Sequence, residues 1–139
     1  MNSYYDNCSE YKREVEKMRL ENTGIEGTLI DIKPLNRVMG QHAFIKGEHW
    51  DYERVTYDYK IGSEEKNVTY YVRIQAYAVE GDIDRGDAVV KILTPLLGKH
   101  YYPHGVEYGP EENFSKSLVE RAHSLVVKVK EELEQYKRQ

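Results

Sequence analysis

The residues best suited to chemistry are gathered between two glycines, in residues 98–109. This stretch contains two histidines, three tyrosines and a glutamate. Histidine titrates near neutral pH, and histidine and tyrosine can each donate and accept hydrogen bonds. The combination is typical of a site that recognises a small polar ligand. The candidate ligand-binding residues of this stretch are His100, Tyr101, Tyr102, His104, Glu107 and Tyr108.

The spacing of the two histidines does not favour a metal site. His100 and His104 are four residues apart, a helical spacing, but Pro103 obstructs a helix through them. On a strand the same spacing would separate the side chains by about 13 Å, too far for one zinc ion. We predict a rigid, tyrosine-rich turn that leaves the last strand, with no metal and no cofactor. A strained mononuclear site that includes Glu107 stays open as an alternative.

Neighbouring strands supply further candidates for ligand binding. These are His49, Trp50, Arg54 and Arg73. A purely structural explanation stays open beside the functional one, because tyrosines on a sheet usually pack their rings at the edge of the core. An arginine on a strand face usually pairs with an acidic neighbour, here Glu53 or Glu80.

Two alternating segments predict the centre of a sheet. Residues 49–61 and 68–79 both alternate with the period of two that a strand with two unlike faces requires. The short polar linker of residues 62–67 predicts that these strands pair as an antiparallel hairpin. Residues 25–32 are rich in β-branched side chains and predict a first strand, and residues 88–94 predict the next strand of a meander.

Two helices complete the predicted fold. Pro34 suits a first helical turn, and apolar residues then recur at helical spacing as far as Ile45. The C-terminal helix has an apolar stripe opposite a charged face, and Ser117 with Glu120 has the spacing of a capping box. The stripe consists of Phe114, Leu118, Ala122, Leu125, Val129 and Leu133. We predict an α+β fold, an antiparallel meander sheet with a short helix after the first strand and a long C-terminal amphipathic helix packed on one face.

Composition limits the classes of function. A chain of 139 residues with a net charge of −4 and both signs of charge interspersed is that of one globular domain. It has no basic stripe for nucleic acid, and its apolar runs are far shorter than the roughly 18 residues that span a bilayer. Residues 1–10 are polar and acidic and do not resemble a secretory signal. We expect a cytoplasmic protein that contacts neither nucleic acid nor membrane.

Residues 1–17 differ from the rest because they lack a hydrophobic period. We expect a disordered or partly helical leader followed by a single α+β domain in residues 18–139. The codons for Arg13-Glu14-Val15 can contain GGAGGT, the core of a bacterial ribosome-binding site. One hypothesis is therefore that Met18 is the natural start and that the leader is not part of the native protein. The alternative is an ordinary N-terminal tail.

Three segments resemble the YugN-like family of small bacterial proteins. They are WDYERVTYD at residues 50–58, YAVEGD at residues 77–82 and LTPLLGKHYYPHGVEY at residues 93–108. The resemblance implies a Gram-positive, Bacillus-like source and a cytoplasmic protein, and it implies no catalytic residues. Members of this family typically begin near the position of Met18, which favours the leader hypothesis.

Three classes of function follow. The first is a small-ligand-binding or regulatory module, because the chain has no nucleophile elbow, phosphate loop or dinucleotide fingerprint. The second is an enzyme that uses His100 or His104 as a general acid or base. The third is a structural homodimer without a small-molecule ligand. The expected partners are a small polar ligand and a second copy of the chain.

Overall fold

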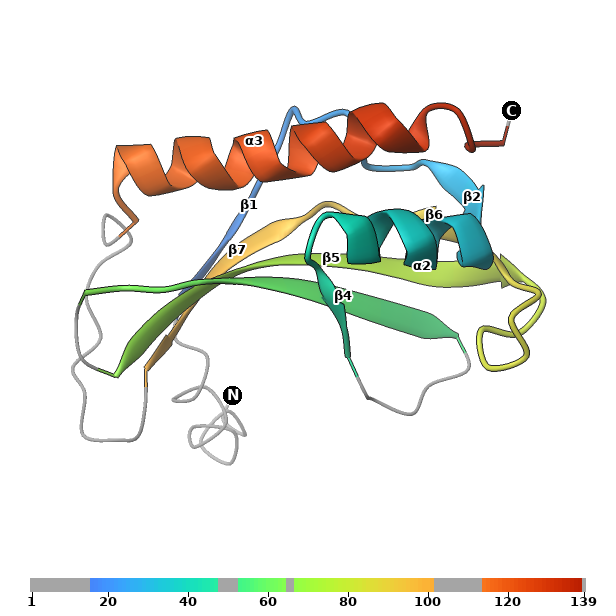
Figure 1. Ribbon diagram of the computed structural model, residues 1–139, viewed down its shortest axis with the longest axis horizontal. Coiled ribbons are helices and arrows are strands. Elements are labelled where there is room, and N and C mark those ends of the chain that lie inside the picture. Colours follow the sequence, from blue (N-terminus) through green and yellow to red (C-terminus); the bar gives the residue numbers. More distant parts are fainter. Residues whose placement is uncertain (1–15, 48–52, 65–66, 102–113, 139) are drawn as a thin grey trace, which may run out of the picture.

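A seven-stranded antiparallel sheet and two helices make up the computed structural model (Figure 1), which describes residues 16–47, 53–64, 67–101 and 114–138. This arrangement confirms the predicted α+β fold. In chain order the elements are β1 (Glu16–Arg19), β2 (Leu29–Asp31), α2 (Ile32–Gln41), β3 (Ile45–Lys46), β4 (Arg54–Ile61), β5 (Val68–Glu80), β6 (Val89–Ile92), β7 (Leu96–Tyr101) and α3 (Lys116–Leu133).

The long strand β5 organises the sheet. One edge of β5 pairs with β4, which confirms the predicted hairpin. The other edge is shared, because β7 pairs with residues 68–73 and β6 pairs with residues 76–80, where the register shifts between Ala78 and Glu80. β1 and β2 extend the sheet beyond β7 and β6, and β3 pairs with β4 at the opposite edge.

The strand β7 was not predicted from the sequence. Gly98 to Tyr101 lie in this strand between β1 and β5, so the prediction that they form a turn after the last strand is wrong. The pattern was missed because Leu96 to Tyr101 contains a glycine and no β-branched residue, the usual signs against a strand. The rest of the predicted turn, residues 102–109, lies outside the described residues.

The N-terminal elements differ from the prediction in their extent. Only Leu29–Asp31 of the predicted strand at residues 25–32 forms a strand. Glu16 and Lys17, which the sequence assigned to a leader, belong to β1 and pair with Lys99 and Gly98. Residues 1–15 lie outside the described part of the chain, so the leader stays a prediction.

The short helix α2 also ends earlier than predicted. It stops at Gln41, and Ala43 has a φ of 67°, a left-handed backbone conformation that turns the chain back toward the sheet. Ile45 therefore lies in β3 rather than on the apolar face of the helix, and its side chain is 69 % exposed.

The C-terminal helix α3 packs on one face of the sheet, as predicted, and α2 lies on the same face (Figure 1). The core forms between this face and the helices, and α3 contributes Ala122, Val126, Val129 and Leu133. The predicted capping box is wrong: α3 begins at Lys116, and the Oγ of Ser115 accepts a hydrogen bond from the backbone N–H of Leu118 at 3.1 Å.

In the described residues neither helix combines the length and the apolar character that crossing a membrane requires.

Tyr57 of β4 is the largest fully buried side chain among the described residues, at 1 % exposed, and its hydroxyl donates to Asn36 Oδ1 at 2.6 Å. Burial raises the pKa of Tyr57 above its usual value near 10. Between pH 10 and this raised pKa the folded state holds a proton that the unfolded chain loses, so the free energy of unfolding falls as the pH rises above 10.

We expect Tyr57→Phe to lower the free energy of unfolding by about 1 kcal/mol at pH 8, because it removes a hydrogen bond. The difference in the free energy of unfolding should shrink by up to about 1.4 kcal/mol per pH unit above pH 10. Only wild type retains the Tyr57 phenol, whose ionisation in the unfolded chain destabilises the fold. Urea unfolding of both proteins at pH 8 and pH 11 measures this difference. An equal deficit at both pH values would contradict the burial of an un-ionised phenol.

Candidate functional site

Strand alternation divides the sheet into a face that packs against the helices and an opposite, outer face. Val72 of β5 is fully buried beneath the helices, so Tyr71 and Arg73 point to the outer face. On β4, Asp58 lies directly opposite Arg73, and Lys60 lies directly opposite Tyr71. The outer face therefore brings two cations, a carboxylate and a phenol together across one pair of strands.

These side chains surround a hollow of about 280 Å³, which we call the outer-face hollow. Three strands contribute to it, because β7 adds a histidine directly opposite a threonine of β5. The lining residues are Asp58, Lys60, Thr69, Tyr71, Arg73 and His100. A concavity of this size with several polar groups suits a small molecule or one group of a larger one.

The guanidinium of Arg73 is fixed on two sides. Its Nε donates to Asp58 Oδ1 at 2.8 Å and its Nη2 donates to Asp58 Oδ2 at 3.1 Å, a bidentate pair. Its carbon Cζ lies 4.8 Å from the centroid of the Tyr71 ring. Together the two contacts hold the planar group in one orientation. The sequence suggested Glu53 or Glu80 as the partner of Arg73. The register of the hairpin instead places Asp58 opposite Arg73.

The Tyr71 ring lies over Gly98, its cross-strand neighbour on β7. A Cβ at Gly98 would come within 2.6 Å of the Tyr71 hydroxyl oxygen and even closer to the ring. Only glycine therefore leaves room for the ring, which is 7 % exposed although it lies on the face away from the helices. Tyr71, which lines the outer-face hollow, is thus close-packed against a residue of the adjacent strand.

Among the described residues, one cation of the outer-face hollow has no carboxylate partner. Arg73 neutralises Asp58, and no carboxylate among the described residues forms an ion pair with Lys60. Lys60 therefore adds a positive charge to this face of a protein whose net charge is −4.

The fold and site can be set beside known proteins. The sequence model of the YugN-like family matches residues 20–136, which include every residue of the outer-face hollow. The chain belongs to the YugN-like family. This confirms the resemblance found in the three sequence segments.

Two curated YugN-like relatives come from Bacillus subtilis strain 168. The uncharacterised protein YlbA is 44 % identical over 109 residues, which cover 78 % of this chain and 89 % of YlbA. The uncharacterised protein YugN is 27 % identical over 96 residues, which cover 69 % of this chain and 70 % of YugN. The crystal structure of the uncharacterised conserved protein YugN from Geobacillus kaustophilus HTA426 matches with a TM-score of 0.74 and 45 % identity, over 85 % of this chain and 96 % of that one.

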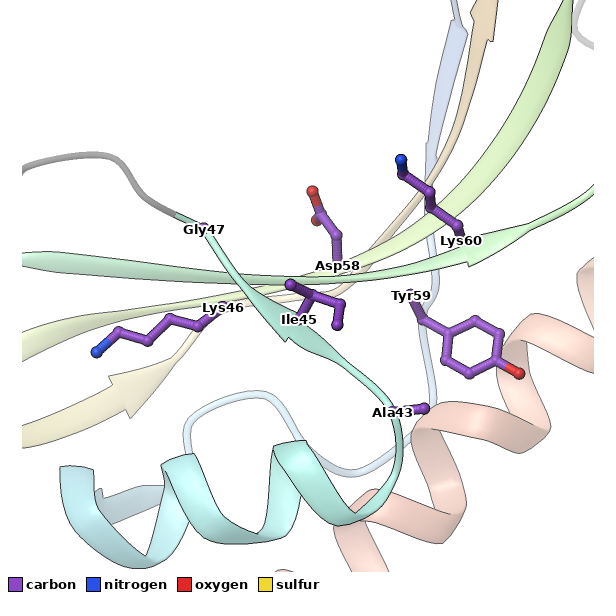
Figure 2. Close-up of a pocket in the computed structure, with 7 residues that line it drawn as sticks. All are labelled: Ala43, Ile45, Lys46, Gly47, Asp58, Tyr59 and Lys60. Carbon is purple, nitrogen blue, oxygen red and sulfur yellow. The ribbon is translucent and has the colours of Figure 1, made fainter.

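A second hollow of this YugN-like protein adjoins the first at the edge of the sheet (Figure 2). This edge hollow has a volume of about 520 Å³. It is lined by Ala43, Ile45, Lys46, Gly47, Asp58, Tyr59 and Lys60. Figure 2 shows Asp58 and Lys60 on one side of β4 and the Tyr59 ring on the other. Asp58 and Lys60 line both hollows, so they form the boundary between them.

Of the residues that the sequence predicted for the YugN-like site, two come together. Arg73 lines the outer-face hollow from β5, and His100 lines it from β7, which pairs with β5. Arg54 is exposed at the start of β4, opposite Tyr77, and does not line the hollow. The backbone of Tyr101 ends β7. The predicted residues His49, Trp50, Tyr102, His104, Glu107 and Tyr108 lie outside the described residues.

Sequence reasoning missed four residues of the outer-face hollow. They are Asp58, Lys60, Thr69 and Tyr71. Alternation alone places all four on the polar faces of the two long strands, so that signal was available. The register of the hairpin could not be predicted from the sequence, because it depends on the geometry of the turn at residues 62–67.

Proposed function

We propose that this YugN-like protein is a cytoplasmic module that binds a small polar ligand in the outer-face hollow. The observation that carries the proposal is the convergence of six polar side chains from three paired strands on one concavity. Side chains anchored on a sheet, and locked by a bidentate pair such as Arg73 with Asp58, are positioned before a ligand arrives. Such preorganisation reduces the cost of binding.

The donor and acceptor set describes the ligand in general terms. Lys60 and Arg73 only donate hydrogen bonds, whereas Thr69 and Tyr71 can donate and accept. The imidazole of His100 can act in either role. A ligand with a negative group and neighbouring hydroxyl or amide groups would satisfy this set.

The proposal predicts a ligand whose affinity depends on His100. A thermal-shift screen of small polar metabolites should find compounds that raise Tm, since a ligand at a hundred times its Kd stabilises the fold by about 2.7 kcal/mol. We expect His100→Asn to weaken the best compound about tenfold, the loss of one polar contact worth about 1.4 kcal/mol. Isothermal titration calorimetry gives both values of Kd.

A matched control is His123→Asn, which changes a half-buried histidine of α3 that lines neither hollow. It should leave the affinity within twofold of wild type. Equal losses in both variants, or none in either, would contradict a site at the outer-face hollow. Conversion of the bound compound by wild type, abolished in His100→Asn, would favour the enzyme alternative over a pure binding module.

A further inference from the structure

The two hollows share charged lining residues, but the edge hollow adds an exposed apolar side chain. Lys60 lines both hollows and has no ion-pair partner in the described part of the chain. The edge hollow has Ile45 at its rim, and Ile45 and Val79 are the exposed large hydrophobic side chains among the described residues. The cationic group of Lys60 and the apolar surface of Ile45 therefore both line the edge hollow.

The edge hollow exists because β3 is much shorter than β4. The two residues of β3 pair only with Tyr57 and Asp58, and Gly47 then donates to the carbonyl of Thr56 at 2.7 Å. Beyond Asp58 the chain turns away at Ala43, whose φ of 67° leads back to α2. In the described part of the chain no strand pairs with Tyr59 and Lys60 at this edge of β4, and the edge hollow lies there.

We propose that the ligand is an amphipathic anion, with its carboxylate or phosphate against Lys60 and its apolar group in the edge hollow beside Ile45. This inference rests on the proposed function and narrows its ligand to one class. A neutral or cationic head would leave the charge of Lys60 uncompensated. A ligand without an apolar group would leave Ile45 exposed to water.

The test uses four simple probes with the full-length protein, titrated at neutral pH and followed by NMR chemical-shift changes. Hexanoate has both the anion and the apolar chain, acetate has only the anion, and 1-hexanol and hexylamine have the chain with a neutral or cationic head. We expect hexanoate to bind at least tenfold more tightly than acetate or 1-hexanol, and hexylamine not to bind. The shifts should lie in residues of β4 and β7 and at Ile45.

Two variants separate the two parts of the site. Lys60→Gln should weaken hexanoate at least tenfold, whereas Ile45→Ser should weaken it several-fold and reduce its advantage over acetate. Lys91→Gln is the matched control, because Lys91 is exposed on β6 and lines neither hollow. Both changed side chains are exposed, and an unchanged Tm in each variant shows that the fold is kept.

The outcomes distinguish this inference from the proposed function. Equal binding of hexanoate and acetate at the outer-face hollow would overturn the amphipathic ligand and keep a polar ligand site. Equal binding of hexanoate and 1-hexanol would overturn the anionic head. No binding by any probe, together with no compound found in the metabolite screen, would overturn both proposals.

Discussion

Gly98→Ala is expected to lower the free energy of unfolding by about 1–3 kcal/mol, the usual cost of overpacking a well-packed position. The new methyl group would occupy the space of the Tyr71 ring, which is almost fully buried and has Arg73 stacked on it. The ring must therefore tilt away, and the Arg73 guanidinium must follow it. Urea unfolding measures the loss of stability, and ligand titration measures the accompanying loss of affinity.

Two further variants isolate the cause. In a Tyr71→Ala background the Cβ at Gly98 meets no ring, so Gly98→Ala should then cost less than about 0.5 kcal/mol. Gly40→Ala is the matched control, because a Cβ at Gly40 in α2 meets nothing within 4 Å. That change should stabilise the protein by up to about 1 kcal/mol, since alanine favours a helix. A loss at Gly98 that persists without Tyr71 would place the cause in the backbone instead.

Gly98 also shows where sequence reasoning stops. From the sequence, a glycine near a proline and two histidines indicated a turn, whereas the structure uses it as a point of close approach in a central strand. Both uses exploit the missing side chain. Only the partner strand decides between them, and the partner, Tyr71, is 27 positions earlier in the chain.

The elements that could be predicted are those with strong periodicity. The alternation in β4 and β5 fixes which side chains face the helices, and the apolar spacing identifies α3. Even there the stripe drifts, since Val126 is buried and Leu125 only half-buried. The ends of elements depend on single residues, such as the positive φ of Ala43 or the Ser115 cap, that composition does not single out.

The site was predictable by residue type but not by partnership. An arginine on a strand was expected to pair with a carboxylate. The sequence did not show which one, because several carboxylates lay within a few residues of a plausible register. Asp58 became the partner because the turn after Ile61 sets the pairing, and a shift of one residue would have turned Asp58 to the other face. His100 lines the same hollow because it belongs to β7, a strand that was not predicted from the sequence.

Exchanging the charges of the central pair should separate its structural role from its role in binding. Arg73→Asp alone places two carboxylates opposite each other at half-buried positions, and we expect a loss of about 2 kcal/mol. Adding Asp58→Arg restores an oppositely charged pair in the same register, so at least half of that loss should be recovered. Arg54→Asp is the control, since an exposed reversal outside the pair should cost less than about 0.5 kcal/mol.

Affinity should not recover with stability in the exchanged protein. The guanidinium would then extend from β4, whereas its stacking on Tyr71 depends on its origin at position 73 of β5. The outer-face hollow would keep its net charge but lose the orientation of its donors, and a planar donor group binds through its orientation as much as its charge. Recovery of both stability and ligand affinity in the exchanged protein would show that the pair contributes charge alone. Recovery of stability without affinity would identify Arg73 as a residue positioned by Asp58 and Tyr71 for the ligand.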